Sequence, residues 1–74
     1  MNRVKFTVIV FFSSGHPAKY HNVTDVVRLL LWIENNLEGG RGWTAANAYY
    51  KDGTFDMQYR PNMVYRGHPK GFNY

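Results

Sequence analysis

The amino-acid sequence predicts an α+β fold in which a single sheet of three strands packs on one helix, in the order strand, helix, strand, strand. Three observations support this prediction: one stretch with helical apolar spacing, one alternating apolar stretch before it, and one hairpin signal after it. A fourth strand is added if Met63–Arg66 forms a short edge strand. The 74 residues are expected to form a single small domain, 1–74, in which residues 66–74 are an irregular tail rich in Gly and Pro.

The predicted helix runs from Val23 to about Leu37, the only long stretch with a helical period. Its apolar face comprises Val23, Val26, Val27, Leu30, Ile33 and Leu37. Asn22 or Thr24 is suited to cap the start, and if Asn22 does so, Asp25 stands in the place of a capping-box acid. Gly39-Gly40 should end the helix, because glycine tolerates the left-handed conformation past a helix end.

Alternating apolar residues predict a first strand over Arg3–Ser13. The wholly apolar face, which should meet the helix, comprises Val4, Phe6, Val8, Val10 and Phe12. The other face is polar at its start and apolar at Ile9 and Phe11, so either the chain's tail or a partner subunit should cover it. The segment faintly resembles a signal peptide, but its apolar run is short and no small-residue cleavage site follows. We therefore interpret it as a strand.

Residues 13–22 are interpreted as a loop, because Gly15 and Pro17 interrupt the strand pattern. The loop is long for a strand-to-helix connection, whose usual length is about 2–6 residues. Long loops on compact domains often carry function. This one holds His16, Lys19 and His21.

The strongest hairpin signal lies at Asp52-Gly53, which suits a two-residue type I′ turn between strands at about 43–51 and 54–60. With that turn, Tyr50 pairs with Phe55, Ala48 with Met57, and Ala46 with Tyr59. These six residues then share the face toward the helix. The opposite face comprises Trp43, Ala45, Asn47, Tyr49, Lys51, Thr54, Asp56, Gln58 and Arg60. We expect the first strand beside the third, 54–60, in antiparallel orientation.

The net charge of +4 is unevenly placed. Residues 1–22 and 57–74 each carry three basic residues and no acid, whereas all five acids fall within 23–56. If the ends meet, they form one basic surface; otherwise they keep a small protein soluble. The chain has no cysteine, which excludes disulfides and thiolate metal sites and is typical of a reducing compartment, so a cytoplasmic location is expected. No segment has the length of a membrane span.

Candidate catalytic patterns do not rise above background. His16 and His21 lie five residues apart in a loop, which is neither a helical nor a zinc-finger spacing. Ser13 and Ser14 lack the strand-turn-helix context of a catalytic serine. The glycines at 39–42 follow a helix, whereas phosphate-binding glycine loops precede one. We therefore expect a protein that is not an enzyme and that uses no metal and no cofactor.

Basic residues interleaved with aromatic ones on the hairpin carry the most functional content. The candidate ligand-binding residues are Arg41, Trp43, Asn47, Tyr49, Lys51, Gln58 and Arg60, together with His16 and Lys19 of the loop. Aromatic faces stack on bases and cations pair with phosphate, so the expected ligand is anionic and carries a base: nucleic acid or a free nucleotide. The alternative is an inhibitor or regulator that binds a protein partner through the aromatic patch. The known aromatic ribonucleoprotein motif and the double-stranded RNA pattern are absent.

Four large apolar side chains fall outside the predicted core. Leu29 and Trp32 lie off the helix stripe, and Ile9 and Phe11 lie on the second face of the first strand. Burying such a side chain is worth roughly 1.5–3 kcal/mol. We therefore expect a homo-oligomer with Phe11, Leu29 and Trp32 as candidate contacts, most simply across a two-fold axis.

Overall fold

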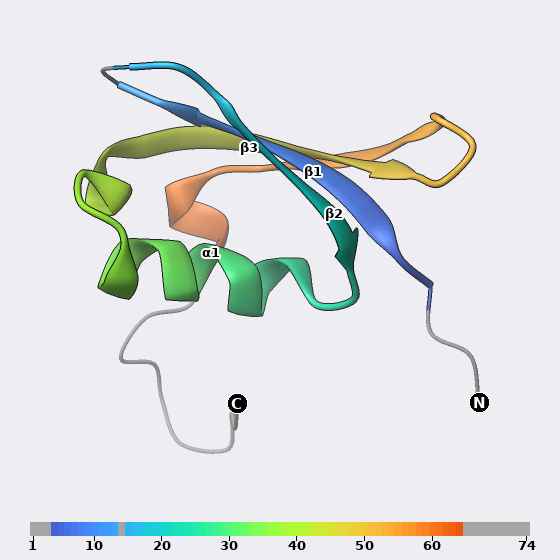
Figure 1. The fold of residues 1–74 in the computed structure, drawn as a ribbon, viewed down its shortest axis with the longest axis horizontal. Coiled ribbons are helices and arrows are strands. Elements are labelled where there is room, and N and C mark those ends of the chain that lie inside the picture. Colours follow the sequence, from blue (N-terminus) through green and yellow to red (C-terminus); the bar gives the residue numbers. More distant parts are fainter. Residues whose placement is uncertain (1–3, 14, 65–74) are drawn as a thin grey trace.

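A computed structural model of the protein describes residues 4–13 and 15–64. It consists of one antiparallel sheet of four strands with one α-helix packed on a single face (Figure 1), which confirms the predicted α+β class. The strands are β1 (Phe6–Phe12), β2 (Ala18–Val23), β3 (Trp43–Tyr50) and β4 (Phe55–Tyr59), and the helix is α1 (Val26–Asn36). Two short 3-10 turns, Gly40–Gly42 and Pro61–Met63, follow α1 and β4.

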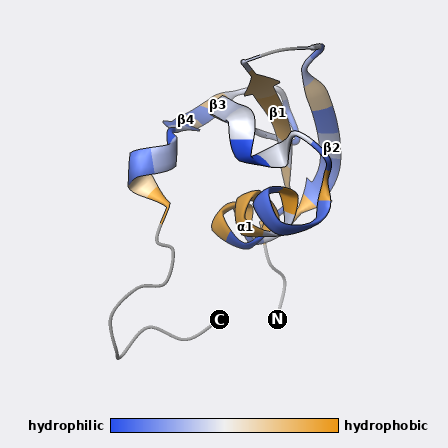
Figure 2. Cartoon of the chain, turned by 90° about the vertical axis from the view of Figure 1, so that its left-hand side faces the viewer, coloured by the Kyte–Doolittle hydropathy of each residue, from blue (hydrophilic) through white to orange (hydrophobic). Residues whose placement is uncertain are grey.

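The order of the strands in the sheet is β2-β1-β3-β4. The fourth strand is therefore β2, within the segment predicted to be a loop, and the element order is β-β-α-β-β. The signal was weak because β2 is a short edge strand, largely hydrophilic in Figure 2, with no buried residue. The predicted edge strand at 63–66 is not seen in its described part, since Met63 ends a 3-10 turn and Val64 is buried; residues 65 and 66 lie outside the described residues.

Strand β1 lies inside the sheet, paired with β2 along one edge and with β3 along the other. It pairs with β3, from Phe6 opposite Tyr50 to Phe12 opposite Trp43, and not with the last strand of the hairpin as expected. The β1–β3 pair is antiparallel, so β2 and β3 run in the same direction on either side of β1. Helix α1 connects these two strands across one face of the sheet (Figure 1).

Helix α1 begins three residues later than predicted because Asn22 and Asp25 have other roles. Asn22 has a φ of +59° and sits in a bulge of β2 opposite β1, a conformation that Asn tolerates better than most residues. Asp25 is itself the cap: its carboxylate accepts a hydrogen bond of 3.1 Å from the backbone N–H of Arg28. Neither Asn22 nor Thr24 is the capping residue.

Two glycines, Gly39 and Gly40, follow the end of α1, as predicted. Gly39 adopts a left-handed φ of +77°. Gly40 is buried, and a Cβ built there would clash with the carbonyl oxygen of Ile33. The backbone can therefore pass this close to the helix only without a side chain.

The β3–β4 hairpin keeps two predicted pairs and changes the third. Ala46 pairs with Tyr59 and Ala48 with Met57, as predicted. The turn, however, has three residues, 51–53, since the N–H of Tyr50 donates to the carbonyl of Thr54 (2.8 Å) and Gly53 has a φ of +93°. The two-residue type I′ turn and the pair between Tyr50 and Phe55 were therefore wrong.

A bulge between the Ala48 and Tyr49 pairs exchanges the faces of two β4 residues. Phe55 pairs with Tyr49, and their rings meet edge to face at 5.6 Å. Asp56 moves to the helix side, where its carboxylate accepts a hydrogen bond of 2.8 Å from the Tyr50 hydroxyl. The sequence had placed each of these two β4 residues on the opposite face.

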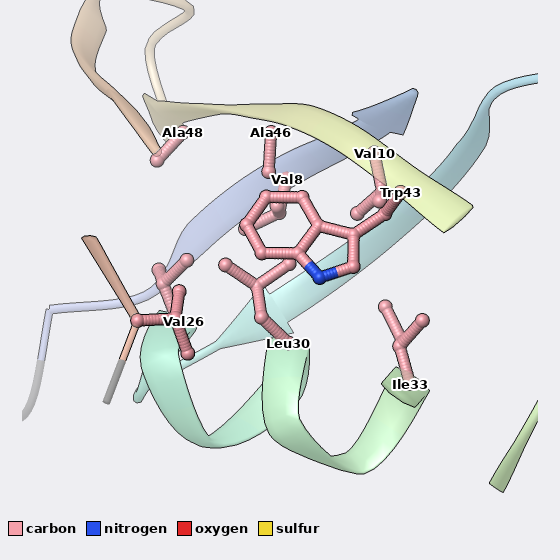
Figure 3. Close-up of a cluster of buried hydrophobic side chains, with 9 residues drawn as sticks. Val8, Val10, Val26, Leu30, Ile33, Trp43, Ala46 and Ala48 are labelled. Atoms are coloured by element: carbon pink, nitrogen blue, oxygen red, sulfur yellow. The ribbon is translucent and has the colours of Figure 1, made fainter. Parts of the chain in front are cut away.

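The core lies between the sheet and α1 (Figure 3). Its buried residues are Val8, Val10, Val26, Leu30, Ile33, Trp43, Ala46, Ala48 and Val64. The two alanines of β3 leave room for the helix, and the Trp43 indole lies between the strands and the helix in Figure 3. The predicted helix stripe is confirmed at its centre, where Val26, Leu30 and Ile33 are buried. It was wrong at both ends, because Val23 ends strand β2 and Leu37 follows the helix and is exposed.

Candidate functional site

The face of the sheet opposite α1 is here called the outer face. Strand alternation and pairing assign to it Thr7, Ile9, Phe11, Lys19, His21, Ala45, Asn47, Tyr49, Phe55 and Gln58. Helix α1 lies on the other side (Figures 1 and 2), where the buried Val64 belongs to the core. Among the described residues, no helix or strand covers the outer face.

A shallow hollow of about 290 Å³ lies on the outer face. Its lining includes Thr7 and Ile9 of β1, Lys19 and His21 of β2, Tyr49 of β3 and Lys51 of the turn. The Thr7 Oγ1 and the His21 Nδ1 are 3.3 Å apart, which ties the edge strand to β1 across the hollow. Lys19 and Lys51 approach from different elements, and none of the described lining residues is acidic.

An exposed aromatic pair lies beside the hollow. Phe55 is 52% exposed, and its ring meets Tyr49, which itself lines the hollow. The pair presents an aromatic surface that a planar ligand group can stack on. Tyr49 belongs to both the hollow and the aromatic pair. A ligand that stacks on the pair can therefore place a charged group of its own in the hollow, which Lys51 also lines.

A row of polar side chains crosses β3 and β4 on the same face. The Gln58 amide donates to the Asn47 carbonyl oxygen at 2.8 Å, and the Arg60 guanidinium donates to the Gln58 oxygen at 3.0 Å. These bonds direct Arg60 along the outer face, although it follows the end of β4. Three basic side chains therefore lie at this face: Lys19, Lys51 and Arg60. No described carboxylate is at an outward-facing strand position.

Six of the nine predicted ligand-binding residues share this region: Lys19, Asn47, Tyr49, Lys51, Gln58 and Arg60. His16 lies apart, lining a separate hollow with Leu37 and Glu38 near the end of α1. Arg41 lies in the 3-10 turn before β3, at the end of the sheet away from Lys51. Of the basic residues near the two ends of the chain, Lys19 and Arg60 do share a face, whereas Arg3, Arg66 and Lys70 lie outside the described residues.

Trp43 does not lie on the outer face, so its predicted place beside Asn47 was wrong. It is 2% exposed and belongs to the core. The register between β1 and β3 shifts after Phe11, so Trp43 pairs with the inward Phe12. Its indole N–H donates to the Glu34 carboxylate of α1 at 2.7 Å.

The sequence missed His21, Thr7 and Phe55 as members of the site. The alternation of Lys19 and His21 with Tyr20 was a weak strand signal that could have placed Lys19 and His21 on one face. Phe55 could have been assigned correctly only with a three-residue turn, which a chain containing Asp-Gly also permits.

Two tyrosines titrate unusually on the helix side of the hairpin. The hydrogen bond to the Asp56 carboxylate, together with the negative charge of that group, raises the pKa of Tyr50. Burial, followed by the charges of Asp56 and Asp25, raises the pKa of Tyr59. Both shifts keep the phenols neutral at physiological pH. Neither phenol therefore adds an anion to the hollow, although Tyr50 is among its lining residues.

The predicted oligomer contacts differ in exposure. Trp32 is 48% exposed on α1, and Phe11 is 36% exposed on the outer face. Leu29, in contrast, is partly buried against the core, so its expected place off the packed side of the helix was wrong. Contact between copies through the other two residues stays a prediction.

Comparisons with models of protein families, with curated proteins and with solved structures find no match. Within residues 4–13 and 15–64, no group of three or more His, Cys, Asp or Glu side chains could hold a metal ion. No helix of the described chain is both long and apolar enough to cross a membrane.

Proposed function

We propose that this is a small non-enzymatic binding protein whose outer face binds an anionic ligand that carries a base, either nucleic acid or a nucleotide. The observation that carries the proposal is the hollow between Lys19 and Lys51, bordered by the exposed pair of Tyr49 and Phe55. It combines a cationic site with an aromatic one on a single open surface.

The hollow accounts for the phosphate. Lysine is a point charge with three donors, and two lysines from separate elements can approach one phosphate from different sides. Lys19 projects from an edge strand and Lys51 from a tight turn, both exposed to solvent. Since no described lining residue is acidic, neither ammonium is neutralised within the hollow.

The aromatic pair accounts for the base. Stacking a base on an aromatic side chain is worth about 1–3 kcal/mol and tolerates any base, because every base has a π-face. The amides of Asn47 and Gln58 lie on the same face and offer further donors and acceptors to a base edge. The same face can therefore hold both parts of a nucleotide.

Inhibition or regulation of a protein partner is the second candidate. It is favoured by Trp32, which is 48% exposed on α1, on the side of the molecule opposite the hollow. Exposed tryptophan is typical of protein interfaces. This surface is separate from the outer face, so variants of the two surfaces distinguish the candidates.

The test is a titration of fluorescently labelled oligonucleotide, followed by anisotropy over a range of salt concentrations. For single strands, each phosphate that the protein neutralises contributes about 0.7 to the slope of log K against log salt. We expect Lys19→Ala/Lys51→Ala to weaken binding and to reduce the slope by about 1.4. Arg28→Ala/Arg41→Ala removes the same charge from exposed positions outside the hollow and should leave the slope nearly unchanged.

Two results would count against the proposal. Absence of binding to single strands, duplexes and nucleotides at low salt would remove it. Equal losses of affinity in the two double variants would show that only net charge matters and that the hollow is not the site.

A further inference from the structure

We infer that the ligand is a single strand of nucleic acid of at least about four nucleotides, lying across the outer face from the Tyr49–Phe55 pair to Phe11. This inference rests on the proposed function and narrows it: a free nucleotide is too short, and a duplex presents the wrong surface. The inference is supported by the spacing of the aromatic side chains along the strands and by a basic residue at the level of each aromatic position.

The two aromatic positions are separated along the strands. Thr7 pairs with Tyr49, whereas Phe11, four residues further along β1, pairs with Ala45. At about 3.3 Å per residue, this offset is about 13 Å. Stacked nucleotides rise about 3.4 Å each, so about four nucleotides cover the distance. A single nucleotide can reach only one of the two positions.

A basic residue lies at the same level of the sheet as each aromatic position. Lys51 follows β3 directly beyond Tyr49 and Tyr50, and it lines the hollow with Tyr49. Arg60 follows Tyr59, which pairs with Ala46, and so lies level with Ala45 and Phe11. The outer face therefore has an aromatic ring at each end, with Lys51 next to the Tyr49–Phe55 pair and Arg60 level with Phe11 on the far side of β3, where it donates to Gln58. A polyanion with regularly spaced bases and phosphates matches this arrangement in charge and in spacing.

The shape of the face favours a single strand over a duplex. Phe11 and Phe55 are 36% and 52% exposed, and a ring can stack only on a base that is not already covered by its neighbours. Bases in a duplex are covered on both sides. Proteins that bind duplexes commonly place a helix in the major groove, but α1, the only α-helix of the described chain, lies on the opposite side of the sheet.

The experiment measures affinity for thymidine nucleotides of one, two, four and eight units, and for a duplex containing the eight-unit strand. We expect affinity to rise steeply between two and four units and slowly afterwards. Phe55→Ala should weaken binding at every length by about 5- to 150-fold, the range that stacking on one base provides. Phe11→Ala should weaken binding of the four-unit strand but not of the two-unit strand.

Trp32→Ala is the matched control, because it removes an aromatic ring of similar exposure from the helix. It should leave every affinity unchanged. Phe11→Leu retains apolar bulk while removing the ring, so it gives the stacking result if Phe11→Ala lowers the stability of the sheet. Circular dichroism at the titration temperature verifies that each variant is folded.

The outcomes separate the inference from the proposed function. A single nucleotide that binds as tightly as the four-unit strand would overturn the inference and leave the proposed function intact, as would a duplex that binds more tightly than the strand. Absence of binding by all of these probes would overturn both. A stoichiometric protein partner whose binding is lost on Phe55→Ala but retained on Trp32→Ala would assign the outer face to a protein and overturn both as well.

Discussion

Trp43 provides the sharpest test of the structure, because its sequence position predicted a ligand-binding residue and the structure makes it part of the core. It is 2% exposed, and truncating a buried Trp to Ala costs about 3–5 kcal/mol. At roughly 0.05–0.15 kcal/mol per residue, a chain of 74 residues has a free energy of unfolding of about 4–11 kcal/mol. Trp43→Ala should therefore remove much of the stability and populate the unfolded state.

Trp43→Phe is the variant for quantitative measurement. It keeps an aromatic ring in the core but removes the indole N–H that donates to Glu34 at 2.7 Å. A hydrogen bond to a charged group contributes about 1.5–3 kcal/mol, and the smaller ring adds a cavity. Urea unfolding followed by circular dichroism should show a loss of about 2–4 kcal/mol. Oligonucleotide affinity should be unchanged in the folded protein.

Trp32→Ala is the control for a surface tryptophan, and it should cost less than about 1 kcal/mol. If Trp43→Phe and Trp32→Ala have equally small effects on the unfolding midpoint, Trp43 is not in the core. If Trp43→Phe instead weakens oligonucleotide binding at unchanged stability, the register shift after Phe11 is wrong, and the sequence-based place of Trp43 on the hairpin face is correct.

Three further predictions concern the scaffold. Leu30→Ala should cost about 2–5 kcal/mol in urea unfolding, because Leu30 is fully buried, and a loss below about 1 kcal/mol would contradict the helix packing. Gly53→Val should cost about 1–3 kcal/mol at its φ of +93°, whereas Gly53→Asn should cost less. The hydrogen bond from the Thr54 backbone N–H lowers the pKa of Asp52 below 3.8, so the stability it contributes is present above that pH and is lost as the pH falls. Asp52→Asn should therefore lose less stability than the wild type on acidification below about pH 4. Parallel plots of the free energy of unfolding against pH for the two proteins would contradict this prediction.

The sequence was sufficient for the parts of the fold that strong apolar patterns determine. Val26, Leu30 and Ile33 recur at helical spacing and are all buried. Ala46 and Ala48 alternate in β3 and pair as predicted, since the Asp-Gly turn restricts the register to a narrow range. In each case local pattern and tertiary packing favour the same arrangement.

Strand β2 could not be found in this way because its pairing, not its composition, makes it a strand. Only its β1-facing edge is hydrogen-bonded within the sheet, and its residues Lys19, Tyr20 and His21 have no buried member. Gly15 and Pro17 before it are typical of a loop, and Asn22 adopts a left-handed φ within it. Its partner β1 supplies the missing stabilisation, and single-sequence patterns contain no information about that pairing.

The candidate site was predicted only as far as alternation holds along each strand. Asn47 and Gln58 are on the expected face because no bulge separates them from the pair of Ala48 and Met57. Tyr49 also keeps its face, because the extra residue of the neighbouring bulge belongs to β4 and not to β3. Trp43 and Phe55 are on the other side of a register shift, and each lies on the face opposite to its prediction. A single bulged residue reverses every assignment beyond it.

The predicted association of copies and the proposed ligand binding would both use exposed aromatic residues, and these residues lie on different sides of the molecule. Phe11 lies on the outer face, where a second copy would exclude a nucleic-acid strand. Trp32 is more exposed and lies on the helix side, so a contact there leaves the outer face free. We therefore expect copies to associate through Trp32, and we expect the oligomer to persist when oligonucleotide is added.

Sedimentation at micromolar concentration, with and without the eight-unit strand, measures this directly. Trp32→Ala should yield a monomer of 8.7 kDa that binds the strand with unchanged affinity. Dissociation of the wild-type oligomer by the strand would instead assign the contact to Phe11, because only a shared surface makes the two partners compete. A wild-type protein that stays monomeric when concentrated would show that Trp32 is exposed without a copy to cover it.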